Sequence, residues 1–292
     1  MLRAVLPGDA NPRTGILLML AGMFMFTAND VLGKHLVAHF PVGQVVLVRS
    51  LAALAILAPL AFRGGITPVV AVPRPGLHAL RSALMAIEGV SFYAAIAYLP
   101  LADTVIYWLA APIYVAVLAS IFLGERLDWR GWTAILVGFA GVILALDPSA
   151  ASLSGPALIA LGGSLVFSVS MVIGRTLRST PDPTMMVWQM AAAVISGALA
   201  LWLLPFPWQP MALTQVAQLC LLGVAALAAH LMTNRALKHA PAAVVMPFQY
   251  SLLPWAVLFG AVFFADTPTT PMLTGAALII AAGLYIALRR PA

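Results

Sequence analysis

The feature that most constrains this chain is a series of apolar runs, each about 20 residues long, separated by short charged or proline-rich breaks. A helix that crosses the hydrocarbon core of a bilayer needs a run of about this length. Uninterrupted Ala, Leu and Met residues lack the apolar and polar alternation of a membrane β-barrel. The sequence therefore predicts an all-α membrane protein with ten transmembrane helices, at 14–36, 41–62, 79–99, 101–123, 129–146, 155–177, 183–204, 216–237, 242–264 and 270–288.

The charged residues support this class and predict a topology. Only 8% of the 292 residues are charged, too few to cover a soluble protein of this size with a polar surface. If the N-terminus lies on the first face, ten crossings place 13 of the 15 Lys and Arg residues on that face, with Lys34 on the other and Arg49 inside the second helix. Cytoplasmic ends of spans collect Lys and Arg. We expect an integral protein of the bacterial inner (plasma) membrane with both termini cytoplasmic, and the net charge of +6 then needs no nucleic-acid partner.

An internal repeat divides the chain in two. An offset of 141 residues aligns the halves without a gap and matches Gly22 with Gly163, Gly33 with Gly174, Lys34 with Arg175, Pro100 with Pro241 and Glu125 with Asp266. We predict a first five-helix unit over residues 1–146 and a second over 147–292. Because five is odd, the second unit enters the membrane from the opposite face, and such inverted repeats serve alternating access around a site near the midplane.

The residues that follow the third predicted helix carry a family pattern. The stretch from Leu99 to Gly141, LPLADTVIYWLAAPIYVAVLASIFLGERLDWRGWTAILVGFAG, resembles the EamA repeat of the drug/metabolite transporter superfamily, and Ala240 to Gly283 resembles its second, weaker copy. One departure is that Asp266 stands where the first copy has Glu125. The resemblance implies a substrate chamber lined mainly by the first, third, fourth, sixth, eighth and ninth helices. Within the superfamily, the length and helix pattern are most similar to YddG-type aromatic amino acid exporters.

Prolines interrupt the fourth and ninth predicted helices at nearly matching positions, Pro112 and Pro254. A proline removes a backbone donor and leaves the carbonyl four residues earlier, here those of Trp108 and Tyr250, without its helical partner. Broken helices at corresponding places in two halves are typical of a transporter binding site. We therefore predict kinks at both prolines and free carbonyls beside substrate-binding side chains; the alternative is that the prolines only bend the helices.

Glu88 lies in the middle of the third predicted helix, where a carboxylate is costly and usually faces a cavity. His78 and Arg81 lie on the same stripe nearer the cytoplasmic end, and we expect them at a cytoplasmic entrance. A buried carboxylate could bind a substrate ammonium group or carry a proton; the alternative is a structural carboxylate bonded to neighbouring helices. The predicted substrate-binding residues are Glu88, Tyr93, Tyr107, Trp108, His230, Asn234, Gln249 and Tyr250.

Three further charged residues lie near the outer ends of the first two helices. Asp30 and Arg49 lie at similar depth in neighbouring antiparallel helices, and Lys34 is one turn beyond Asp30. We expect Asp30, Lys34 and Arg49 to form a structural charge network at the outer mouth, or to gate it.

Motifs for other chemistries are missing. The chain has no phosphate-binding G-x-x-x-x-G-K-[ST] loop, no metal-ligand spacing and no hydrolase motif. We therefore expect no cofactor, no metal and no catalytic residues. The sequence predicts a secondary transporter that exports amino acids, aromatic ones favoured, or similar amphipathic metabolites through the lipid bilayer. The alternatives are a broad drug or cation exporter and, from another class, a membrane enzyme or assembly subunit that acts on lipid; the sequence predicts neither the oligomeric state nor the energy coupling.

Overall fold

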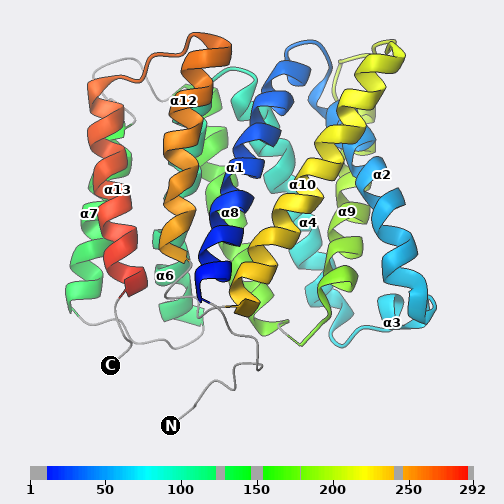
Figure 1. Ribbon diagram of the computed structural model, residues 1–292, viewed down its shortest axis with the longest axis horizontal. Coiled ribbons are helices and arrows are strands. Elements are labelled where there is room, and N and C mark those ends of the chain that lie inside the picture. The colour runs from blue at the N-terminus through cyan, green and yellow to red at the C-terminus, as the bar shows by residue number, and fades with distance from the viewer. Residues whose placement is uncertain (1–11, 123–128, 146–153, 178, 240–245, 289–292) are drawn as a thin grey trace.

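Apolar helices lie side by side across the whole molecule (Figure 1). The computed structural model describes residues 12–122, 129–145, 154–177, 179–239 and 246–288, and these residues form helices and no strand. The helices are α1 (Pro12–Val37), α2 (Val42–Ala61), η1 (Phe62–Gly64), α3 (Thr67–Val70), α4 (Pro75–Ile96), α5 (Leu101–Leu109), α6 (Ala111–Phe122), α7 (Trp129–Ala145), α8 (Gly155–Thr176), α9 (Asp182–Leu203), α10 (Leu213–His239), η2 (Met246–Ser251), α12 (Leu252–Phe264) and α13 (Thr270–Leu288).

Seven helical segments in the described part of the chain have the length and composition of membrane spans, namely α1, α2, α4, α5 with α6, α8, α9 and α10. Three shorter apolar helices complete the bundle: α7, α12 with the end of η2, and α13. The all-α membrane class predicted from the sequence is confirmed. The count of ten crossings stays a prediction.

The fourth and ninth spans are irregular near the prolines. The break between α5 and α6 falls at Ala110, two residues before Pro112, and η2 is a 3-10 helix that precedes α12. Pro254 therefore lies in the first turn of α12, where a helix leaves its N–H groups unpaired and tolerates proline. The expected free carbonyl of Trp108 is not free, because it accepts the backbone N–H of Ala110. Helix breaks thus lie near both prolines, the kinks themselves stay a prediction, and the expectation of a free carbonyl at Trp108 is wrong.

The main helix contacts connect the two halves of the chain. Helix α1 packs against α10, α4 against α8, α2 against α9 and α7 against α13. The 141-residue offset converts α1 into α8 and α4 into α10, so the first two contacts are copies of each other. The same offset converts α2 into α9 and α7 into α13, so each of the other two contacts joins a helix to its own equivalent in the second half. A two-fold relation between the halves requires this. The halves are therefore interleaved rather than separate lobes, and the domain limits at residues 146 and 147 stay a prediction.

The second half runs in the opposite sense to the first. Helices α1 and α4 end at the same side of the bundle, where the Lys34 ammonium donates to the carbonyl of Leu99 just beyond α4. Helix α8 is antiparallel to α4, because Gly163 lies against Ser91 near the end of α4 and Gly174 against Arg81 near its start. Helix α8 therefore runs opposite to α1, its equivalent in the repeat, which is the predicted inverted arrangement.

Glycines let the interleaved helices approach closely. At the crossing of α2 and α10, Gly223 lies so near the backbone that a Cβ atom there would overlap the carbonyl oxygen of Arg49. At the crossing of α2 and α9, a Cβ on Gly43 would lie 2.9 Å from the carbonyl oxygen of Gly197. Small residues at such crossings are how membrane helices gain packing contacts when lipid is as apolar as their side chains. These crossings fix the depth and rotation of α2, which carries one of the site residues.

The topology predicts a result for reporter fusions. A tag after Ala150, between the halves, and a tag after Ala292 should report opposite sides of the membrane, because five crossings separate them. Alkaline phosphatase and green fluorescent protein fusions measure this, with the signal of each expected at only one position. Tags that report the same side would contradict the inverted arrangement.

Candidate functional site

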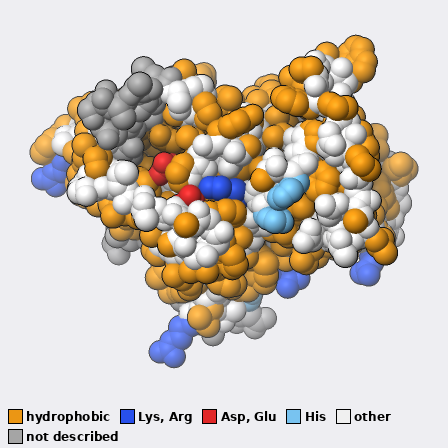
Figure 2. Space-filling view, turned by 90° about the horizontal axis from the view of Figure 1, so that it is seen from above, with side chains coloured by type: hydrophobic (Ala, Val, Ile, Leu, Met, Phe, Trp, Pro, Cys, Tyr) orange, Lys and Arg blue, Asp and Glu red, His pale blue; other side chains and the backbone are white. Residues whose placement is uncertain are grey.

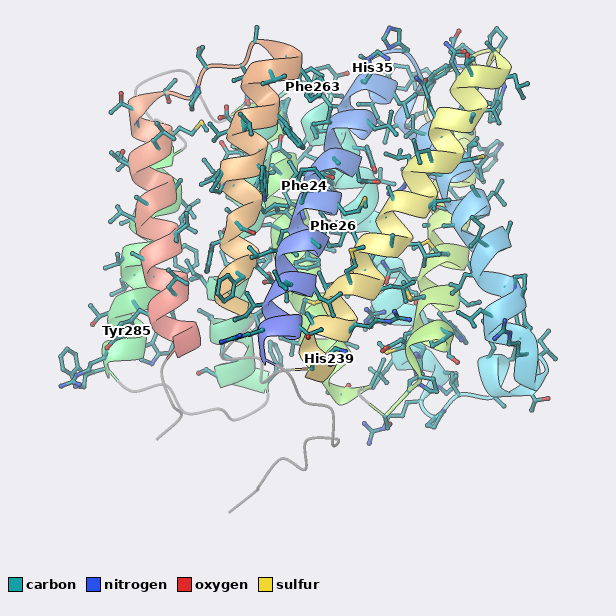
Figure 3. The ribbon with its side chains drawn as sticks, viewed as in Figure 1. Phe24, Phe26, His35, His239, Phe263 and Tyr285 are labelled. Carbon is teal, nitrogen blue, oxygen red and sulfur yellow. The ribbon has the colours of Figure 1, made fainter. Side chains whose placement is uncertain are left out.

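Polar side chains from five helices gather inside the bundle. Asn29 and Asp30 come from α1, Arg49 from α2, Glu88 and Tyr93 from α4, Trp108 from α5 and His230 from α10. Both α1 and α10 pass this region, and Figure 3 shows Phe26 about midway along α1. The contacts below show which of these side chains meet.

Glu88 and Trp108 are in direct contact. The indole Nε1 of Trp108 donates a hydrogen bond of 2.8 Å to Oε1 of Glu88. Phe92, one turn beyond Glu88, packs edge-to-face on the indole with the ring centroids 5.0 Å apart. On its other side the indole lies against Gly163 of α8. The half-buried carboxylate of Glu88 therefore lies at the edge of an aromatic wall formed by Trp108 and Phe92. Its second oxygen is not bonded to any described residue.

Arg49 and Tyr93 form a second contact. Nη1 of Arg49 donates to the Tyr93 hydroxyl at 3.0 Å, and the guanidinium carbon lies 4.7 Å from the centroid of the same ring. Tyr93 is buried and its ring lies against Gly33 of α1. Arg49 is also near enough to Asp30, Glu88 and His230 to interact with them electrostatically. This guanidinium is therefore the positive centre of the cluster.

The remaining central residues lie on α1 and α10. Asn29 and Asp30 are both buried, and the amide of Asn29 donates to Oδ1 of Asp30 at 3.3 Å. The ring of His230 packs edge-to-face against Phe26 with centroids 4.9 Å apart. His230 is thus held in the contact between α1 and α10 rather than bonded to Glu88 in the described part of the chain.

Other predicted substrate-binding residues have different surroundings. Tyr107 is buried in a cluster with Ala95, Ala157 and Ala160, and Trp108 packs against the same cluster. The hydroxyl of Tyr250 lies against Gly283 of α13. Gln249 is half-buried in η2.

The side chain of Asn234 lies outside the described part of the structure. The structure therefore brings Glu88, Trp108 and Tyr93 with Arg49 into one region, and a substrate contact by the other predicted residues stays a prediction.

The charge network at the outer end differs from the expected one. Lys34 forms an ion pair of 3.0 Å with Asp266, which follows α12, and not with Asp30. Oδ2 of Asp266 also accepts the backbone N–H of Leu101 at 3.1 Å. Asp30 and Lys34 are one turn apart on α1, but a partner 232 residues away satisfies the lysine. Figure 2, which looks onto this end, shows acidic and basic side chains meeting amid apolar surface.

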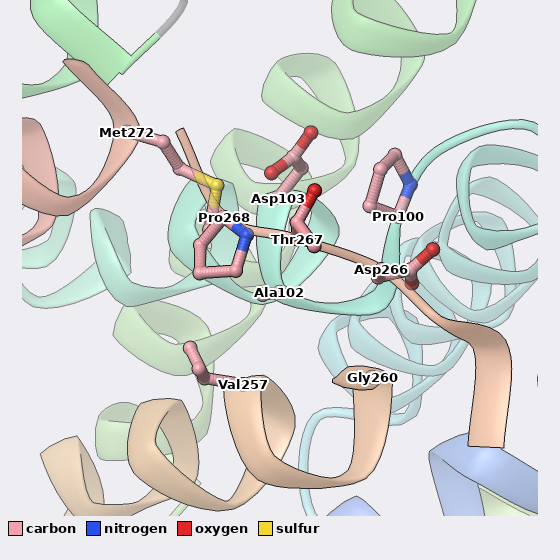
Figure 4. A pocket seen from close by; sticks show the side chains of 9 residues that line it. All are labelled: Pro100, Ala102, Asp103, Val257, Gly260, Asp266, Thr267, Pro268 and Met272. Atoms are coloured by element: carbon pink, nitrogen blue, oxygen red, sulfur yellow. The ribbon is translucent and has the colours of Figure 1, made fainter. Parts of the chain in front are cut away.

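A small hollow adjoins this ion pair (Figure 4). Its lining includes Asp103 from α5 and Asp266 and Thr267 from the connection between α12 and α13. The hollow lies at the end of the bundle, apart from Glu88, and its two acids share the charge of Lys34. We do not assign it to the substrate site.

The predicted cytoplasmic-entrance residues lie at the opposite end of α4. Nε2 of His78 is 3.2 Å from the Thr180 hydroxyl, just before α9, and the ring is near Trp188 with centroids 5.9 Å apart. Arg81 lies against Gly174 of α8. Both residues thus lie where the first half meets the second, and their role as an entrance stays a prediction.

Sequence reasoning missed Phe26, Phe92, Asn29 and Asp266. Phe92 did give a signal, because it lies four residues after Glu88 on the same helical stripe, but it was not assigned to the site. Phe26 gave none, since phenylalanine is common in membrane helices. Asp266 did give one, because the repeat matches it with Glu125, a residue outside the described part of the structure. Within the described residues no three His, Cys, Asp or Glu side chains are grouped as metal ligands.

Comparison with known proteins identifies the family. The model of the EamA-like transporter family matches the chain twice, over residues 13–146 and 155–288. The chain belongs to the EamA-like transporter family. Its two EamA repeats and its relatives among transporters of the drug/metabolite superfamily make it a transporter and not an enzyme.

Several relatives of this EamA protein have named cargoes. A riboflavin transporter of Rhizobium johnstonii is 31% identical over 214 residues, which are 73% of this chain and 70% of that protein. The pseudopaline exporter CntI of Pseudomonas aeruginosa is 27% identical over 277 residues, 92% of this chain and 94% of the exporter. An S-adenosylmethionine uptake transporter of Rickettsia felis is 23% identical over 273 residues, 94% of this chain and 92% of that one.

The fold has a counterpart among solved structures. A crystal structure of a protein with 18% sequence identity superposes with a TM-score of 0.63, covering 93% of this chain and 95% of the other. At this identity the likeness shows the fold alone. Together with the relatives, it makes this EamA protein an integral membrane transporter of small molecules, while the YddG-type branch stays a prediction.

Proposed function

We propose that this EamA-family transporter exports amino acids, aromatic ones favoured, from the cytoplasm across the inner membrane by alternating access. The observation that carries the proposal is the 2.8 Å hydrogen bond between Glu88 and Trp108, with Phe92 packed on the same indole. A carboxylate beside an aromatic wall matches an ammonium group beside an apolar side chain. The inverted halves that meet around this cluster supply the two-state architecture.

A second candidate is a broad exporter of organic cations. Asp30 is buried, 7% exposed, and close enough to Glu88 to interact with it electrostatically, so the cluster contains two acids at similar depth. Two acids favour a cationic cargo, and aromatic rings also bind cations. Arg49 opposes this reading, because its positive charge is near both acids and would repel a cargo without an anionic group.

Counterflow in proteoliposomes tests the proposal. Vesicles loaded with unlabelled phenylalanine should accumulate labelled phenylalanine or tryptophan faster than labelled alanine, because the aromatic wall adds about 1 kcal/mol to binding of a ring. Vesicles without protein are the control. Exchange of organic cations without exchange of any amino acid would replace the proposal by the second candidate. Repeating the assay with an imposed proton gradient shows whether transport is coupled to protons.

A further inference from the structure

The central cation, Arg49, is held in place by its backbone. Where α2 crosses α10, Gly223 packs directly against the carbonyl group of Arg49, so the two helices cannot slide apart without losing this contact. The side chain then reaches from α2 toward α4, where it meets Tyr93. The backbone contact fixes the position of Arg49 on α2, and the contact with Tyr93 holds the half-buried guanidinium in the cluster.

Most hydrogen-bonding capacity of this guanidinium is unused within the described structure. A guanidinium has five N–H donors in a rigid fork. Nη1 donates to Tyr93, while Nε is buried and has no acceptor among the described residues. No described carboxylate lies within 4 Å of Arg49, in contrast to Lys34, which forms an ion pair with Asp266. A planar fork with vacant donors is the group that proteins use to bind a carboxylate with two parallel hydrogen bonds.

A glycine lies beside this fork and next to the acid. The residue that follows Glu88 is Gly89, and a Cβ atom built there would be 3.7 Å from Nη2 of Arg49. The guanidinium thus faces a position without a side chain, one residue from the carboxylate that Trp108 holds. A positive and a negative group are presented side by side but do not pair with each other.

We infer that Arg49 binds the carboxylate of the cargo, so that the transported molecules are zwitterions whose ammonium group interacts with Glu88. This inference rests on the proposed function and assigns its substrate class. It replaces the expectation that Arg49 belongs to a structural network with Asp30 and Lys34. A purely structural arginine would instead balance the acids and would not distinguish cargo with a carboxylate from cargo without one.

Ligand-induced thermal shifts of the purified full-length protein test this role. The probes are phenylalanine, phenethylamine, which lacks the carboxylate, and 3-phenylpropionate, which lacks the ammonium group. We expect Arg49→Gln to weaken binding of phenylalanine and 3-phenylpropionate by about 10- to 100-fold and to change phenethylamine binding by less than about 3-fold. Arg49→Lys should fall between, because it keeps the charge but loses the fork. Arg63→Gln, which removes an exposed arginine from η1, is the matched control and should change none of the three.

Three results would overturn the inference. The first is equal weakening of all three probes in Arg49→Gln, which indicates a structural role. The second is unchanged binding of both carboxylate probes in Arg49→Gln, and the third is no binding of either carboxylate probe by the unaltered protein. If Arg49→Gln does not fold, Gly89→Val keeps the charge and places a side chain against Nη2 of the guanidinium, and it should weaken only the two carboxylate probes. Unchanged binding of the two carboxylate probes by Gly89→Val, or equal weakening of all three probes, then overturns the inference.

The proposed function fails in a different way. If the unaltered protein exchanges no amino acid in counterflow but binds 3-phenylpropionate through Arg49, amino acid export is wrong and the carboxylate site stands. If phenylalanine exchanges normally in Arg49→Gln, export stands and the assignment of Arg49 is wrong.

Discussion

Replacing Glu88 with alanine is expected to lower the initial rate of amino acid counterflow by about 10- to 150-fold, because a hydrogen bond to a charged group contributes about 1.5–3 kcal/mol. In the structure Glu88 bonds to the indole of Trp108 and to no other described side chain, so the variant loses one internal contact. The protein should therefore still fold, and gel filtration should show the same single peak as the unaltered protein. Initial counterflow rates at equal protein density measure the effect.

Two further variants and a control separate the charge of Glu88 from its hydrogen bond with Trp108. Glu88→Gln retains an acceptor for the indole and loses the charge, so it should transport nearly as poorly as Glu88→Ala. Trp108→Phe keeps an aromatic ring and removes the donor, and we expect a smaller loss of about 3- to 10-fold. Ser196→Ala is the control, since among the described residues that hydroxyl bonds to the carbonyl of Ala193 in its own helix and to no other group. A Glu88→Ala protein that transports at the normal rate would remove Glu88 from the site.

Replacing Gly223 with leucine should strongly destabilise the folded protein. A Cβ atom at this position overlaps the carbonyl oxygen of Arg49, and this oxygen belongs to a helix backbone that cannot rotate away. Overpacking of a side chain costs about 1–3 kcal/mol where the neighbours can move, and more is expected against backbone. Total stabilities are about 5–15 kcal/mol, so we expect a large loss of monodisperse protein and a melting temperature lower by 10 °C or more, at about 2–4 °C per kcal/mol.

Gly162→Leu is the matched control for this prediction. Gly162 is also in a helix, α8, but nothing lies within 4 Å of a Cβ atom built there. Leucine has a higher helix propensity than glycine by somewhat less than about 1 kcal/mol. The control should therefore melt at the same temperature as the unaltered protein or slightly above it. Similar losses in both variants would show that the crossing at Gly223 is not the cause.

Sequence periodicity located the helices and the depth of the polar residues, but it could not fix how each helix is rotated. Tyr107 and Trp108 are adjacent and differ by about 100° around α5, so both cannot face Glu88. The hydrogen bond from the indole shows that Trp108 is the residue that does, while both rings pack in a cluster with Ala157 and Ala160 of α8. Those alanines lie about 50 residues away in the chain, and local spacing contains no information about them.

Pairing between residues far apart in the chain also could not be predicted from the sequence. The sequence placed Asp30 and Lys34 one turn apart on a single helix face, which made a local network plausible. Lys34 instead reaches Asp266 at the end of α12, and that pairing depends on how the two halves interleave. The inverted fold could be predicted, because a repeat with an odd number of helices implies inversion. The family resemblance supported the same fold.

The interleaving of the halves also affects how the chain is made. Helix α1 ends at Val37 and its main partner, α10, begins at Leu213. At translation rates of about 5–20 residues per second, α1 therefore waits about 10–40 s in the membrane before that partner is synthesised. Helix α2 likewise waits for α9. The early helices must be held by lipid, or by the insertion machinery, as separate spans during this interval, so the biogenesis of this transporter is a late assembly event and not the stepwise completion of two bundles.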